Sequence, residues 1–209
     1  TAIFKVLDLK KSNTKRKPSP PFITSTLQQE ASNKMGMSPD VVMRCAQKLY
    51  ENGLITYHRT DSLMLADDAL TAIGDFIKNK FGDNYHNFKK YKTKSANSQE
   101  AHEACRPTDV NKLSVSDIEG LTHGEKRLYQ LIWKRTVGSQ MAPADVEIKS
   151  VKLGLETTSY TFTGKFEKIL FPGFLVLNTK KASKDEDDDS DEDEDGDTGN
   201  KKSKNKQLS

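Results

Sequence analysis

The spacing of apolar residues divides most of the chain into a helical middle and flanking β segments. Between Thr24 and Met35, apolar residues lie four apart, and between Ser38 and Asn52 they fall on one helical face. Helical spacing of this kind predicts helices over residues 24–35, 38–52, 62–82 and 122–142. A short helical turn is expected near residue 102, stopped by Pro107.

Start and stop signals support these helices. Ser38 precedes Pro39, a favoured first helical residue, and Gly53 follows the last periodic position, so the second helix has both of its boundaries marked. Ser62 is the expected cap of the third helix. Two helices joined through a glycine turn and followed by a short strand, residues 54–57, are typical of a helix-turn-helix with a wing.

Alternating apolar and polar residues predict strands on both sides of this helical region. The expected strands cover residues 2–11, 145–155, 158–170 and 171–177, and the proline-rich and basic segment 12–21 is expected to be a linker or hinge. The predicted fold class is therefore α+β. A mainly helical domain with a winged-helix-like (CAP-like) element, residues 18–143, is inserted into a β-rich domain formed by residues 1–17 and 144–178.

Charge is distributed unevenly. Eleven of the 30 acidic residues lie between Asp185 and Asp197, so residues 1–184 carry a net charge of +10 although the whole chain has only +3. We expect residues 179–209 to be a disordered acidic and lysine-rich tail. The net positive charge of residues 1–184 favours a polyanionic partner such as nucleic acid. The alternative is an ordinary solvated, lysine-rich surface.

The cysteines and the hydropathy restrict the class of protein further. Cys45 and Cys105 fit no metal-binding or redox spacing, which favours reduced thiols in an intracellular protein. No stretch approaches the roughly 20 apolar residues of a membrane span, so no membrane partner is expected.

The candidate chemistry lies in "GLITYHRTDS", residues 53–62. A tyrosine that closes an apolar strand is usually a packing residue whose hydroxyl finds a hydrogen bond. Arg59, two residues beyond Tyr57, would share a strand face with it. There it could favour the phenolate or bind a phosphate that the phenolate attacks. The spacing permits a covalent phosphotyrosine but does not require it.

Four motifs in order resemble one family. "PPFITSTLQQEAS", "AQKLYENGLITYHRTDS", "SQEAHEACRPTDV" and "LYQLIWKRTVGSQMAPA" are similar to the strand-passage region of type IA DNA topoisomerases, close to the bacterial topoisomerase I branch, and "FPGFLVL" resembles the return into that family's β arch domain. The resemblance covers residues 1–178.

The resemblance implies a role for each matching residue. Tyr57 matches the nucleophile that becomes linked to the 5′ phosphate of a cleaved strand, and Arg59 matches the arginine that binds the scissile phosphate. His102 matches a histidine that contacts the DNA backbone, Asp61 an acid that orients such groups, and Arg106 a phosphate contact. The implied activity is relaxation of negatively supercoiled DNA without ATP, with single-stranded or underwound DNA as the partner.

Two departures from the family pattern stand out. His58 occupies a position that is commonly methionine, and we expect its side chain to point to the other side of the strand, so that His58→Met leaves cleavage nearly intact. The family binds Mg²⁺ through acids of a separate toprim domain, which nothing in this sequence resembles. We therefore expect the chain to be a central fragment that is inactive in relaxation by itself and works with a toprim domain of its own polypeptide. A non-catalytic winged-helix DNA-binding module is the alternative.

Overall fold

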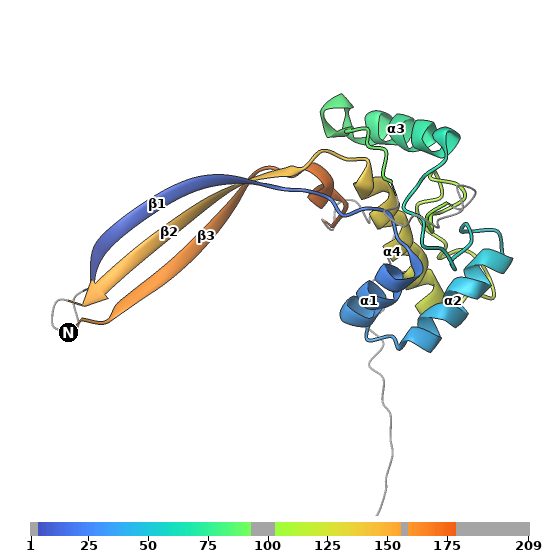
Figure 1. Cartoon of the computed structure of the whole chain (residues 1–209), viewed down its shortest axis with the longest axis horizontal. Coiled ribbons are helices and arrows are strands. Elements are labelled where there is room, and N and C mark those ends of the chain that lie inside the picture. The colour runs from blue at the N-terminus through green and yellow to red at the C-terminus, as the bar shows by residue number, and fades with distance from the viewer. Residues whose placement is uncertain (1–3, 93–102, 156–158, 179–209) are drawn as a thin grey trace, which may run out of the picture.

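The computed structural model describes residues 4–92, 103–155 and 159–178, and these form a long β arm attached to a helical body (Figure 1). The arm consists of three strands, β1 (Phe4–Arg16), β2 (Ala144–Leu155) and β3 (Thr161–Phe171). The body contains four helices: α1 (Thr24–Met35), α2 (Pro39–Glu51), α3 (Asp67–Phe81) and α4 (His123–Ser139). Two 3-10 turns, η1 (Asp83–Tyr85) and η2 (Gly173–Asn178), complete the described elements. The α+β class predicted from the sequence is confirmed.

The β arm is an antiparallel sheet in the order β1-β2-β3. β1 pairs with β2 from Phe4↔Leu155 to Arg16↔Ala144, so the helices from Thr24 to Ser139 lie in sequence between two paired strands. The predicted linker over residues 12–21 is wrong in its first part, because β1 continues to Arg16. Every residue of β1 is exposed, and its polar second half is held in the sheet by backbone pairing with β2 rather than by burial.

The helical body has one core in which α4 is central. Leu128, Ile132 and Val137 of α4 are fully buried and belong to the same cluster as Leu27 of α1 and Leu49 of α2. Apolar burial on this scale is the main stabilising contribution to such a body. The arm by contrast contributes mostly exposed residues.

The predicted boundaries of α1, α2 and α4 are close to those of the structure. The Ser38 side chain caps α2 by accepting from Val41 N–H, and Thr122 and Glu125 form a reciprocal capping box at α4. Gly36 ends α1 in the left-handed conformation, with φ 67°.

The third helix begins later than predicted. α3 starts at Asp67, and Ser62 is not its cap, since the buried Ser62 hydroxyl accepts from the Met64 N–H within the preceding loop. The N-cap residue of α3 is Ala66, whose N–H donates to the Glu103 carboxylate. A side chain distant in sequence therefore takes the place of a local cap.

Two shorter elements predicted from the sequence are also wrong, and a third, the helical turn near residue 102, lies partly outside the described residues. Residues 54–57 form no strand, only the single bridge Ile55↔Pro107. Residues 103–107 are extended rather than helical, with a second bridge Phe22↔Cys105, and residues 171–177 end in the turn η2 rather than in a strand. The strand that was expected to form the wing of a winged helix is therefore not formed by residues 54–57. The division into domains at residues 17/18 and 143/144 stays a prediction. No described helix is long and apolar enough to cross a membrane.

Candidate active site

Tyr57 lies on the loop between α2 and α3, residues 52–66, which we call the Tyr57 loop. Its side chain is 43% exposed. Its ring lies 5.2 Å from the Tyr50 ring and 5.3 Å from the His58 ring, both centroid to centroid. Among the described residues the Tyr57 hydroxyl has no hydrogen-bond partner. The ring is therefore supported on its sides while its oxygen remains accessible, which differs from the ordinary packing tyrosine.

The N-terminus of α1 holds the Tyr57 loop through Thr24. The Thr24 hydroxyl accepts from Thr60 N–H at 2.9 Å and lies within donating distance of the carbonyls of His58 and Thr60, at 2.9 and 3.1 Å. The backbone N–H of Thr24 also donates to the Thr60 carbonyl at 2.9 Å. One residue of α1 thus fixes the backbone on both sides of Arg59.

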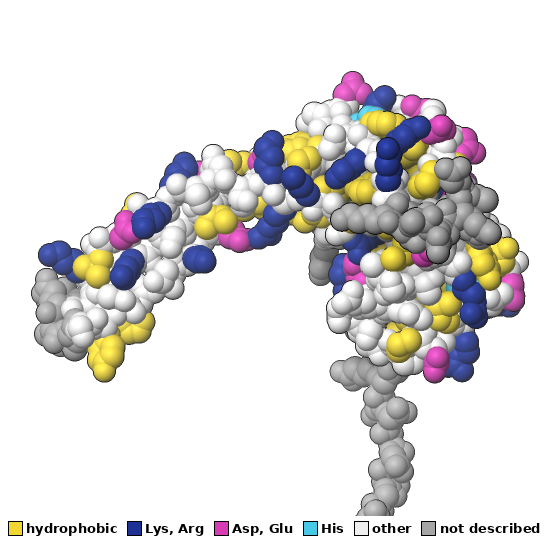
Figure 2. All heavy atoms as spheres, in the orientation of Figure 1, with side chains coloured by type: hydrophobic (Ala, Val, Ile, Leu, Met, Phe, Trp, Pro, Cys, Tyr) yellow, Lys and Arg dark blue, Asp and Glu magenta, His cyan; other side chains and the backbone are white. Residues whose placement is uncertain are grey.

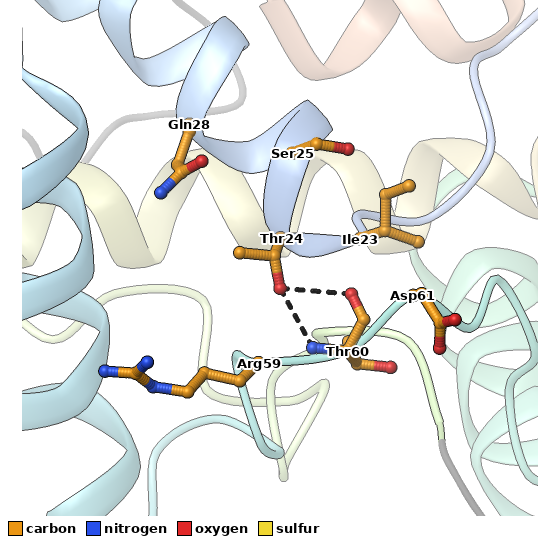
Figure 3. A pocket seen from close by; sticks show the side chains of 7 residues that line it. All are labelled: Ile23, Thr24, Ser25, Gln28, Arg59, Thr60 and Asp61. Carbon is orange, nitrogen blue, oxygen red and sulfur yellow. Dashed lines mark hydrogen bonds between the residues drawn. The ribbon is translucent and has the colours of Figure 1, made fainter. Parts of the chain in front are cut away.

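A pocket of about 480 Å³ opens where the loop meets α1 (Figure 3). Its lining consists of Ile23, Thr24, Ser25, Gln28, Arg59, Thr60 and Asp61. In Figure 3 the Arg59 side chain extends along the loop on the Gln28 side, whereas the Asp61 side chain lies on the opposite side of Thr60. Arg59 and Asp61 are both exposed. Both residues therefore line the pocket, but their side chains lie on different sides of Thr60.

The electrostatics of this pocket favour an anion. The N-terminus of a helix carries a partial positive charge, and the first turn of α1 contains no acidic residue to neutralise it, although Thr24 N–H already donates to the Thr60 carbonyl. The Arg59 guanidinium adds a permanent charge with donors that match phosphate oxygens. A phosphate group is the ligand that this combination suits best.

A second segment, residues 103–108, lies along the Tyr57 loop as an extended strap. Thr56 N–H donates to the Arg106 carbonyl at 2.8 Å, and Arg106 N–H donates to the Thr56 hydroxyl at 2.9 Å. Further along, the Thr60 hydroxyl donates to the Glu103 carbonyl at 2.7 Å. The loop that carries Tyr57 is thus held on two sides, by α1 and by this strap.

Comparison with known proteins identifies the family. The family model described as DNA topoisomerase matches residues 1–208. The chain belongs to the DNA topoisomerase family. The resemblance to the type IA, bacterial topoisomerase I-like branch is confirmed by relatives named DNA topoisomerase 1: one from Synechocystis is 50% identical over 161 residues, and one from Acanthamoeba polyphaga mimivirus is 44% identical over 170 residues.

A solved structure shares the fold as well. The full-length topoisomerase I from Thermotoga maritima has a TM-score of 0.70 and 37% sequence identity, and the match covers 83% of this chain and 29% of that one. The Synechocystis and mimivirus matches cover 76% and 78% of this chain but 18% and 20% of those relatives. The chain thus spans about a fifth of the length of the curated topoisomerases it matches.

The structure brings only some of the predicted site residues of this topoisomerase chain close together. Tyr57, Arg59 and Asp61 share one loop, whereas His102 lies outside the described residues. The Arg106 guanidinium donates twice to the Glu103 carboxylate, at 2.9 and 3.3 Å, and once to the Pro107 carbonyl at 3.1 Å. With its side chain only 14% exposed, Arg106 would have to exchange these partners to bind a phosphate.

His58 does not follow the strand geometry expected for it. No strand is present to alternate the two side chains, and although His58 is buried while Tyr57 is exposed, the two rings are in edge contact. Both ring nitrogens of His58 are buried without a hydrogen-bond partner among the described residues. Burial lowers the pKa of His58, the nearby Arg59 lowers it further, and Glu51 acts in the opposite direction.

Sequence reasoning missed Thr24 and Glu103. Thr24 belongs to a run of hydroxyl residues at the start of a predicted helix, where capping already accounts for such residues. Glu103 follows His102 in a motif in which the histidine was the candidate site residue. Both act on residues more than 30 positions away in sequence, Thr24 on Thr60 and Glu103 on Ala66. A local pattern carries no signal for such a contact.

The described residues provide no metal site. None of them form a group of three or more His, Cys, Asp and Glu side chains that could hold a metal ion. Binding of Mg²⁺ to a toprim domain stays a prediction.

Thr24→Val tests how the Tyr57 loop is held. Valine keeps the shape but removes the hydroxyl, so Thr60 N–H loses its acceptor. We expect the free energy of unfolding in urea to fall by about 1–3 kcal/mol. Ser25→Ala, in the same pocket wall but exposed, is the matched control and should change it by less than about 0.5 kcal/mol. Equal effects of the two substitutions would show that the Thr24 bonds do not hold the loop.

Proposed function

We propose that this chain is the nucleophile-bearing segment of a type IA DNA topoisomerase, in which Tyr57 cleaves one DNA strand transiently. The observation that carries the proposal is the exposed Tyr57 hydroxyl, which has no hydrogen-bond partner among the described residues, on the loop that brings Arg59 to an anion-suited pocket. A tyrosine needed only for packing would bury its ring and pair its hydroxyl.

The reaction conserves the bond energy of the DNA backbone. The Tyr57 phenol loses its proton and its oxygen bonds to the scissile phosphorus, while the bond from phosphorus to the 3′ oxygen breaks and that oxygen takes up a proton. The products are a 5′-phosphotyrosine and a free 3′-hydroxyl. Attack of this hydroxyl on the same phosphorus reverses both changes, so resealing needs no ATP.

Arg59 is the proposed clamp for the scissile phosphate. Arg59 is exposed and lines the pocket together with residues of the first turn of α1. Charge that develops on the phosphate oxygens during attack is stabilised by fixed donors of this kind. Asp61, exposed on the same loop, is proposed to orient a group that arrives with the DNA or with the rest of the protein, and His102 and Arg106 are proposed to contact the DNA backbone.

The β arm is the proposed connection to the rest of the polypeptide. Both of its outer strands expose large apolar side chains, and Figure 2 shows such residues on the surface of the arm. The most exposed are Leu9 at 65% and Phe166 at 64%. Exposed apolar surface of this extent usually marks an interface. We propose that further strands of the arch domain cover it, that the helical body swings relative to the arch, and that a toprim domain supplies Mg²⁺ beside Tyr57.

A non-catalytic DNA-binding module remains a rival function of a different class. The basic residues suit it equally well, but the predicted wing at residues 54–57 is absent. A mere binder also has no use for an accessible phenol beside a phosphate clamp. No described feature favours the rival over the proposed function.

Covalent capture of DNA separates the two functions. A polypeptide of the relatives' length that contains this chain is mixed with 3′-labelled single-stranded DNA and Mg²⁺ and then denatured. A topoisomerase leaves label attached to protein, because the 5′ phosphate of the labelled fragment is bonded to tyrosine. A binding module releases all of the label.

The isolated 209-residue chain is expected to bind single-stranded DNA weakly and to leave supercoiled plasmid unrelaxed. Its basic part contacts phosphates, so affinity measured by fluorescence anisotropy should fall steeply between 50 and 200 mM salt, about tenfold or more. Plasmid relaxation with Mg²⁺ by this chain alone would contradict the assignment of the metal site to another domain.

A further inference from the structure

His58 is a polar residue in an apolar position. Its side chain is fully buried, and neither ring nitrogen has a hydrogen-bond partner among the described residues. Unpartnered polar atoms at such a site are rare and costly in folded proteins, so this one calls for an explanation. Its contacts provide one, since the His58 ring lies 5.3 Å from the Tyr57 ring and 6.1 Å from the Tyr50 ring.

We propose that neutral His58 is a positioning residue that sets the orientation of the Tyr57 phenol, and that protonation of His58 releases this phenol. The inference rests on the proposed function of Tyr57 as nucleophile. The three rings form a triangular cluster, with centroid distances of 5.2 Å for Tyr50–Tyr57, 5.3 Å for Tyr57–His58 and 6.1 Å for Tyr50–His58. Edge contacts of this kind fix ring orientation as well as adding stability.

The charges around His58 oppose its protonation. Arg59 on the same loop is the cation that acts on it, and Glu51 at the end of α2 is the acid that acts in the other direction. The α1 residue that hydrogen-bonds to the His58 backbone is Thr24, which carries no charge. Burial and Arg59 together lower the pKa of His58 below its usual value near 6.5.

The sign of the pH dependence follows from this direction. Above about pH 6.5 His58 is neutral both folded and unfolded, and the buried ring is tolerated. As pH falls below about 6.5, the unfolded state takes up the proton first, so the buried arrangement loses stability until the folded group is also protonated. A charged imidazole without a partner is expelled toward water, and its contact with the Tyr57 ring is lost.

Nuclear magnetic resonance on the 209-residue chain tests this coupling without any cleavage assay. The chain has four histidines and six tyrosines, so ring signals are assignable by single substitution. We expect the Tyr57 ring signals to shift on acidification with the same midpoint as the His58 ring, below pH 6.5. Tyr57 signals that stay unchanged while His58 titrates would overturn the proposal.

Apolar substitutions supply the second arm of the test. His58→Met and His58→Leu, two shapes in case one does not fold, should abolish the acid-dependent shift of Tyr57, whereas His123→Gln, at the exposed start of α4, should preserve it. A shift that persists in the folded His58 variants would also overturn the proposal.

Adduct formation by the longer polypeptide extends the test to function. Between pH 8 and pH 5.5 the adduct yield of the unsubstituted protein should fall by a factor at least ten times larger than that of His58→Met, each compared with its own yield at pH 8. An identical acid loss in both would contradict the positioning role. Absence of any adduct at pH 8 would instead count against the proposed function, and the magnetic resonance result would then still decide the coupling.

Discussion

Tyr57→Phe is expected to abolish covalent attachment of DNA, with adduct yield falling on the order of 10⁴-fold or more. Such a loss corresponds to about 5.5 kcal/mol of transition-state stabilisation. The substitution removes one oxygen and leaves the ring contacts with Tyr50 and His58 in place, so the fold should be unchanged. The measurement is the fraction of 3′-labelled single-stranded DNA that remains bound to the denatured polypeptide.

Tyr50 is a closely matched control for this substitution. It is 41% exposed, almost the same as Tyr57, and its ring lies 5.2 Å away on α2. Tyr50→Phe should retain adduct formation within a few fold, because the Tyr50 hydroxyl lies on α2 and is not the proposed nucleophile. Loss of adduct in Tyr50→Phe with retention in Tyr57→Phe would mean that the wrong tyrosine has been assigned.

Gly173→Ala should have the largest effect on stability among single substitutions at glycines. Gly173 has φ 48°, and an added Cβ would overlap the carbonyl oxygens of Ala142 and Pro143. The backbone approaches closely here because η2 returns to the segment between α4 and β2, where Phe174 N–H donates to the Ala142 carbonyl at 3.0 Å. Strain at positive φ and overlap with rigid backbone together should lower the free energy of unfolding by about 3 kcal/mol or more.

Gly36→Ala separates the two contributions. Gly36 has φ 67°, but nothing lies within 4 Å of an added Cβ. Only the conformational strain applies there, about 1–2 kcal/mol. Urea unfolding of both variants gives the difference, and equal losses would show that the close approach at Gly173 relaxes without cost. Gly173 begins η2, two residues after the end of β3.

The helices were predictable because their signals are local. Apolar periodicity and caps marked α1, α2 and α4 to within a few residues, and Ser38 caps α2 as expected. The start of α3 was not predictable, because the Glu103 carboxylate that accepts from its N-cap residue is distant in sequence. Ser62 has the residue type of a helix cap but is buried in the preceding loop. The length of β1 was not predictable either, since residues 11–16 are polar and pair with β2 through the backbone and through ion pairs such as that of Lys11 with Glu147.

The site shows the same division between local and distant signals. Tyr57 and Arg59 stand in one short motif, so the sequence identified them together. The pairing of Arg106 with Glu103, the anchor at Thr24 and the burial of His58 all depend on contacts between segments. The strand expected to separate His58 from Tyr57 is reduced to a single bridge, although His58 is buried and Tyr57 is exposed.

Identification of the residue that is covalently linked to DNA tests the central claim most directly. After capture of single-stranded DNA by the longer polypeptide, nuclease and protease digestion leave a nucleotide on one peptide, which tandem mass spectrometry locates. The account predicts a 5′-nucleotide on the oxygen of Tyr57. A nucleotide on Tyr50 or on any other residue would contradict it.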